Sequence, residues 1–131
     1  CKVTIASANN ATDFGDLFSV RRDLASCSSN TRGVFAGGND GSAVNIIEYV
    51  TIASDSNTTD FGDLLDTVSK LSGTSNSTRG VFAGGTLGTG YDSNVIQYIT
   101  IASLANSIDF GDLADDRPYM AAISDSHGGL S

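Results

Sequence analysis

The chain repeats itself with a period of 47 residues, and this repetition is the sequence feature that most limits its fold. The octapeptide TRGVFAGG stands at residues 31–38 and again, unchanged, at residues 78–85. The pentapeptide DFGDL occurs at residues 13–17, 60–64 and 109–113, and its third copy comes two residues later than the period requires. Each period should therefore fold into one supersecondary unit that packs on its neighbours, with a loop of variable length before the third DFGDL.

Each period predicts four short strands separated by turn residues. We expect them in the first complete unit at residues 24–28, 32–36, 45–54 and 61–65. The third of these segments is rich in β-branched and aromatic residues, and a Gly-Gly pair ends the second. Residues 18–25 are the best helix candidate, but they have no clear cap and are interpreted as strand or loop. The chain is thus predicted to be all-β, with about three four-stranded antiparallel repeats.

The boundaries of the repeats divide the 131 residues into one repeat domain with incomplete ends. Residues 1–20 supply only the third and fourth strands of a half-unit, residues 21–67 and 68–116 are complete units, and residues 117–131 begin another. The predicted core consists of the apolar residues of the strands: Val34, Phe35, Ile46, Ile47, Val50, Ile52, Phe61, Leu64, their counterparts Val81, Phe82, Val95, Ile96, Ile99, Ile101, Phe110 and Leu113, and in the half-unit Ile5, Phe14 and Leu17.

The pattern of an apolar strand ending in Gly-Gly, a variable loop and a strand carrying Tyr49 or Tyr98 resembles the kelch repeat. That resemblance implies a propeller-like arrangement of the units, in which each unit is one four-stranded blade. A kelch blade would next carry Trp, and here Phe14, Phe61 and Phe110 stand in roughly that place.

The motifs TRGVFAGG, EYVTIAS (residues 48–54) and DFGDL together resemble an uncharacterised repeat of large virion and tail-fibre-like proteins of marine bacteriophages. The resemblance covers nearly the whole chain, including the ending at residues 124–130. It implies a structural or adhesive role outside the cell, on a virion surface, and it implies no enzymatic activity.

Composition excludes several classes of function. Seven basic against fifteen acidic residues give a net charge of −8, which disfavours nucleic acids and anionic membranes as partners. No apolar run is long enough to cross a bilayer. The only histidine is His127, and the carboxylates recur at equivalent turn positions, whereas a catalytic pair is normally a single arrangement. We therefore expect neither an enzyme nor a cofactor.

Candidate sites are weighed against simpler structural roles. The repeated aspartates are weak Ca²⁺ candidates, although turn capping is the favoured interpretation. The variable loops could hold a ligand such as a glycan, Arg32 and Arg79 could pair with the repeated aspartates, and Cys1 and Cys27 could form a disulfide. The remaining candidates are listed by kind: Ca²⁺, Asp13, Asp16, Asp60, Asp63, Asp109 and Asp112; ligand loops, Asn39, Asp40, Thr86, Tyr91 and Asp92; glycosylation, Asn10, Asn57 and Asn76.

The incomplete ends suggest self-association. Residues 1–20 and 117–131 are complementary halves of one unit, so the halves of two chains could pair, with Cys1, Val3, Ile5, His127 and Leu130 at the interface. A head-to-tail contact of this kind builds a ring or a filament. The alternatives are closure of the two halves within one chain, and a fragment cut from a longer array.

Two functions follow as expectations. The first is a structural repeat protein of an extracellular assembly, such as a virion appendage, tail fibre or fibril, with copies of itself or other virion proteins as partners. The second is a carbohydrate-binding or adhesive module that uses the loops after the Gly-Gly pairs.

Overall fold

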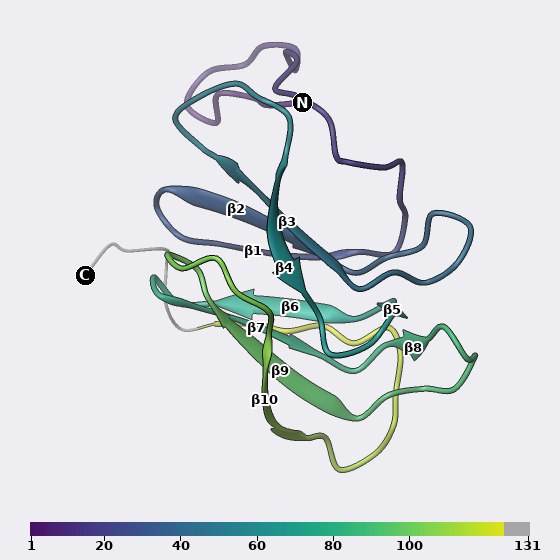
Figure 1. Cartoon of the computed structure of the whole chain (residues 1–131). Coiled ribbons are helices and arrows are strands. Elements are labelled where there is room, and N and C mark those ends of the chain that lie inside the picture. Colours follow the sequence, from purple (N-terminus) through teal and green to yellow (C-terminus); the bar gives the residue numbers. More distant parts are fainter. Residues whose placement is uncertain (125–131) are drawn as a thin grey trace.

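The computed structural model describes residues 1–124 and consists of two four-stranded sheets that pack against each other, joined by a two-stranded pair (Figure 1). All three sheets are antiparallel, and residues 1–124 contain no helix. The first sheet has the order β1-β2-β3-β4, the second β6-β7-β9-β10, and β5 pairs with β8. The strands are β1 (Ala25–Ser28), β2 (Arg32–Ala36), β3 (Ile46–Thr51), β4 (Thr59–Asp63), β5 (Val68–Ser69), β6 (Ser72–Ser75), β7 (Arg79–Ala83), β8 (Thr86–Leu87), β9 (Val95–Thr100) and β10 (Ile108–Asp112).

The two large sheets have the same register, strand for strand. Arg32 of β2 lies opposite Thr51 of β3, and Arg79 of β7 lies opposite Thr100 of β9. We call β1–β4 the first sheet and β6, β7, β9 and β10 the second sheet. The first lies within residues 21–67 and the second within residues 68–116. Repeated sequence therefore gives repeated strand pairing.

The DFGDL motif forms a β-bulge on the outer strand of each sheet. The pairing of β4 with β3 skips Phe61, and that of β10 with β9 skips Phe110. Gly62 has a φ of +149°, and a Cβ atom there would lie 2.6 Å from the carbonyl oxygen of Ala105. The motif thus needs glycine both for its backbone conformation and for the close approach of the next unit.

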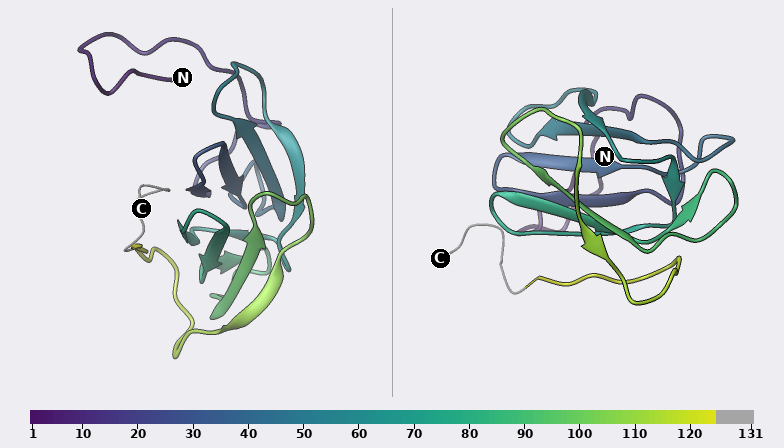
Figure 2. Two further views of the ribbon diagram at one scale, coloured as in Figure 1. Left: turned by 90° about the vertical axis from the view of Figure 1, so that its left-hand side faces the viewer. Right: turned by 60° about the horizontal axis from the view of Figure 1, so that its bottom comes forward.

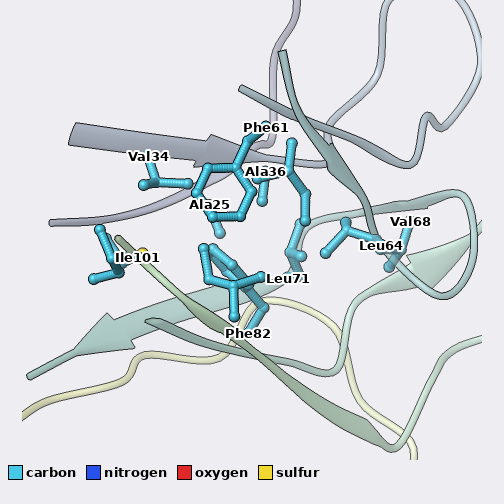
Figure 3. Close-up of a cluster of buried hydrophobic side chains, with 12 residues drawn as sticks. Ala25, Val34, Ala36, Phe61, Leu64, Val68, Leu71, Phe82 and Ile101 are labelled. Atoms are coloured by element: carbon cyan, nitrogen blue, oxygen red, sulfur yellow. The ribbon is translucent and has the colours of Figure 1, made fainter. Parts of the chain in front are cut away.

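The core lies between the two sheets (Figure 3). Of the predicted core residues, Val34, Ile47, Phe61 and Leu64 in the first unit and Phe82, Ile99 and Ile101 in the second are buried. Sequence reasoning missed Ala25, Cys27, Ala36, Val68 and Leu71, which are also buried. Ala25, Cys27 and Ala36 lie in β1 and β2, and Val68 and Leu71 lie in the segment that connects the two sheets.

Several predicted core residues are not buried. Ile5, Ile52 and Phe110 are exposed, and the others are half-buried: Phe14, Leu17, Phe35, Ile46, Val50, Val81, Val95, Ile96 and Leu113. Most of them lie on the half-unit or on sheet faces that the other sheet does not cover, whereas Val95 is on the face of the buried Gln97 and Ile99 but at the end of its strand. The prediction was wrong for them because it placed every apolar strand residue in the core, and apolar character alone does not show which face of a strand is covered.

The prediction of strands in residues 1–20 was also wrong, because this segment holds only the isolated bridge between Lys2 and Thr12. Two strands without neighbours are only marginally stable. The expected strand at residues 32–36 is confirmed as β2, while the segments at 45–54 and 61–65 are strands over Ile46–Thr51 and Thr59–Asp63.

Residues 1–20 and 117–124 contact different sheets. Lys2, Asp16 and Phe18 bond to Asp55, Asn57 and Glu48 of the first unit. Residues 117–124 bond to the second unit and follow its side of the molecule (Figure 2). Within residues 1–124 the two segments do not pair with each other, so the alternative of closure of the halves within one chain is not seen in this part of the chain.

Candidate functional site

The candidate site is the pair of sheet faces that no other sheet covers. Equivalent residues of the two units differ sharply in exposure. Phe61 is 3% exposed, whereas Phe110 at the same position of the second unit is 57% exposed. Ile101 is 1% exposed, whereas its equivalent Ile52 in the first unit is 47% exposed. One face of each sheet packs against the other sheet, in the contact that we call the covered interface. The opposite face of each sheet carries the same residue types, and no other sheet covers it.

The covered interface shows what these faces can do. Both inner strands meet there, because the Ser28 amide donates to Ser75 Oγ at 3.2 Å and Ser75 Oγ donates to the Ser28 carbonyl at 2.8 Å. A Cβ atom at Gly80 would lie 2.5 Å from Cys27 Sγ. Gly80 thus marks a point where the two units approach each other too closely for any larger residue.

Arg32 crosses the covered interface. Its Nη1 donates to the carbonyl oxygen of Ile101 at 2.7 Å, and its guanidinium lies 4.4 Å from the ring centroid of Tyr49. Arg79 repeats the ring contact with Tyr98 at 4.6 Å. Neither arginine forms an ion pair with the repeated aspartates in residues 1–124, so the predicted Arg–Asp pairing was wrong, and cation–π contacts take its place.

A ladder of backbone hydrogen bonds runs through the units at residues that differ in sequence. Asp23, Lys70 and Tyr119 occupy equivalent positions, and all three have positive φ angles of 55–60°. The Lys70 amide donates to the Asp23 carbonyl at 2.8 Å, and the Tyr119 amide donates to the Lys70 carbonyl at 3.1 Å. Residues 117–124 therefore begin in the conformation with which the second unit begins.

A hollow of about 300 Å³ lies on the uncovered side of the first sheet, between the sheet and residues 14–17. Phe14 and Leu17 stand at the positions of Phe61 and Leu64, while Phe35 and Val50 stand at the positions of Phe82 and Ile99. The residues that line it are Cys1, Phe14, Gly15, Asp16, Leu17, Leu24, Phe35, Val50 and Thr58. The hollow is therefore a partial copy of the covered interface, without the inner strands of the preceding unit.

One buried ion pair distinguishes the first unit from the second. The side chain of Glu48 is buried and pairs with the buried guanidinium of Arg21. Burial lowers the pKa of Arg21, and the Asp40 carboxylate opposes that effect. In the second unit, Gln97 and Val68 hold the two equivalent positions.

Glu48 and Gln97 accept hydrogen bonds from backbone amides at equivalent positions of the repeat. Glu48 Oε2 accepts from the Phe18 amide at 2.9 Å and from Thr58 Oγ1, and Gln97 Oε1 accepts from the Leu65 amide at 2.9 Å and from Ser107 Oγ at 2.7 Å. Each residue thus ties the end of one unit to the third strand of the next. Sequence reasoning missed this buried polar position, although it lies at a repeated place in the third strand.

The candidate Ca²⁺ ligands do not converge. All six aspartates are exposed, and residues 1–124 contain no group of three or more His, Cys, Asp or Glu side chains that could hold a metal ion. Asp109 Oδ1 instead accepts from the Gly111 amide at 3.1 Å, which is a turn contact.

The candidate ligand loops lie on two separate turns. Asn39 Oδ1 accepts from the Gly41 amide at 3.0 Å, beside the exposed Asp40. In the second unit, Thr86 Oγ1 donates to Asp92 at 3.1 Å and leaves Tyr91 76% exposed. The longer second loop thus presents one aromatic ring to solvent.

The cysteines and the glycosylation candidates are placed as follows. Both thiols are free, with Cys1 exposed and Cys27 buried, so the expected bridge is not formed within this chain. Burial raises the pKa of Cys27 to about 12. Asn10, Asn57 and Asn76 are exposed, and the side chains of Asn57 and Asn76 accept backbone hydrogen bonds. Of the candidate interface residues, Val3 and Ile5 are exposed, and His127 and Leu130 lie outside the described residues.

Comparison with models of protein families gives no match, and comparison with curated protein sequences gives no significant match. Within residues 1–124, no helix has the length and apolar character needed to cross a membrane.

Proposed function

We propose that the chain is a structural repeat protein that builds an extracellular assembly by packing its repeats face to face. The observation that carries the proposal is the difference in exposure between Phe61 and Phe110, and between Ile101 and Ile52. Large exposed apolar side chains are typical of a protein interface, and here each sheet carries one, Phe110 in β10 of the second sheet and Ile52 directly after β3 of the first. Here the chain's own covered interface indicates the kind of partner: another repeat of the same type.

The arrangement of the two sheets supports a propeller-like relation between units. Their inner strands β1 and β6 bond to each other through Ser28 and Ser75, and each sheet continues outward to β4 or β10. Blades of a propeller meet in this way around an axis. The resemblance to phage repeats favours a virion appendage or tail fibre as the assembly.

The test is the mass of the chain in solution as a function of concentration, followed by sedimentation and by electron microscopy. We expect rings or filaments to form with rising concentration, and Ile52→Asp or Phe110→Asp to reduce them at least tenfold. The matched control is Leu104→Asp, because Leu104 is similarly exposed at 55%, and its equivalent in the first unit, Asp55, is already polar. A monodisperse monomer at about 100 µM, well above the dissociation constant of a micromolar contact, would overturn the proposal.

A second function, glycan binding, is favoured by Tyr91. Its exposed ring stands on a loop held by the hydrogen bond from Thr86 to Asp92, and such a ring can stack on a sugar face. A glycan array probed with the native chain and with Tyr91→Ala tests this function. Binding that the variant loses supports it, and an array without signal refutes it.

A further inference from the structure

The hollow on the first sheet has a defined shape because the chain contains a filled copy of it. In the covered interface, Phe82 and Ile99 of the second sheet face inner-strand residues of the first unit, among them Ala25 and Cys27. In the hollow, Phe35 and Val50 take the places of Phe82 and Ile99, but no inner strand lies against them in residues 1–124. What the hollow lacks is therefore one inner strand with small or apolar residues at alternate positions.

Residues 117–124 match that description. By the repeat they are equivalent to residues 68–75 and 21–28, which places Ala121 at the position of Ala25 and Ile123 at that of Cys27. Both side chains are exposed. The segment also has the backbone conformation found just before the inner strands β1 and β6. Tyr119 has a φ of 55° and its amide donates to the Lys70 carbonyl, as the Lys70 amide donates to the Asp23 carbonyl.

We propose that the hollow binds residues 117–124 of a second copy of this chain, as the inner strand of a composite unit whose outer part is residues 1–20 of the first copy. This inference rests on the proposed function and names the partner segment and its register. The occupied hollow would continue the covered interface across two molecules in a head-to-tail contact.

The repeat sets the register of the contact. In the backbone ladder, the residue at the Lys70 position donates to the carbonyl at the equivalent position of the preceding unit, Asp23. The Asp23 amide of one copy should therefore donate to the Tyr119 carbonyl of the other. By the same rule, Ser28 of one copy should meet Ser124 of the other, as Ser75 meets Ser28 within the chain.

Gly33 lies opposite Val50, one of the residues that line the hollow, and a side chain there offers a way to block the proposed contact without disturbing the chain's own core. Its equivalent, Gly80, has no room for a Cβ atom because Cys27 Sγ would lie 2.5 Å away. A Cβ atom at Gly33 meets only Val50 Cγ2, at 3.3 Å. We expect Gly33→Val to keep the melting temperature of the isolated chain and to weaken association at least tenfold. The matched control is Thr89→Val, which places the same side chain on an exposed loop.

Cross-linking tests the register directly. In a background of Cys1→Ser and Cys27→Ala, chains carrying Ser28→Cys are mixed with chains carrying Ser124→Cys and oxidised. We expect a covalent dimer from the mixture in severalfold excess over either chain alone. Ser28→Cys with Ser75→Cys in a single chain is the positive control, because it should cross-link within the monomer.

The outcomes separate the two proposals. Association without the Ser28–Ser124 cross-link, or association that Gly33→Val leaves unchanged, overturns the inner-strand inference and leaves the structural function standing. A chain that stays monomeric under all conditions overturns both.

Discussion

Replacement of Phe61 and of Phe110 by alanine is a matched experiment on the covered interface. Both rings occupy the bulge of a DFGDL motif and make the same edge-on contact within their own sheet, with ring centroids 6.0 Å from Tyr49 and 5.8 Å from Tyr98. They differ in their cover, with exposed fractions of 3% and 57%. The difference in stability therefore isolates what the neighbouring unit contributes.

The magnitude follows from burial. Removal of a fully buried phenylalanine side chain costs about 3–5 kcal/mol, which includes the cavity left behind. Phe110 has less than half of its surface buried and opens to solvent, so its loss should cost about 1–2 kcal/mol. We therefore expect Phe61→Ala to lower the free energy of unfolding by about 2–3 kcal/mol more than Phe110→Ala does.

Urea unfolding followed by circular dichroism measures both variants, at a concentration low enough to keep the chain monomeric. The midpoint should fall much further for Phe61→Ala, with the slope unchanged. Equal losses for the two variants would refute the reasoning, because they would mean that the contact within each sheet, and not the packing between units, accounts for the stability that the ring provides.

Two further predictions concern buried polar groups. Glu48→Gln should lower the free energy of unfolding by about 3–5 kcal/mol, because it leaves the Arg21 charge buried without its partner. Adding Arg21→Val gives the residue pair that the second unit has at these positions, and it should restore most of the lost stability. A double variant as unstable as the single one would contradict this explanation. Cys27 should resist a thiol reagent at pH 8, while the exposed Cys1 should react. Because burial raises the pKa of Cys27 from 9.0 to about 12, the stability that Cys27 contributes should be present below pH 9 and fall as the pH rises towards 12. Stability measured against pH for the native chain and for Cys27→Ala checks this, and parallel curves would contradict it.

The repeat allowed the sequence by itself to determine the all-β class and the position of β2, because an eight-residue match fixes equivalent residues and the apolar spacing of 32–36 suits a strand. It also placed Phe61, Phe82 and Ile101 in the core. A local pattern suffices for these features, since the alternation of side chains in a strand depends only on neighbouring residues.

Only the tertiary structure decided which copies of a repeated residue are covered. Phe61 and Phe110 have identical neighbours in the DFGDL motif, and Ile101 and Ile52 share the motif TIAS, yet one member of each pair is buried and the other exposed. The buried contact between Arg21 and Glu48 was equally hidden, because it joins residues far apart in the chain. Whether such a residue is buried depends on what packs against its face of the sheet, and the residues of one strand do not show whether another unit packs there.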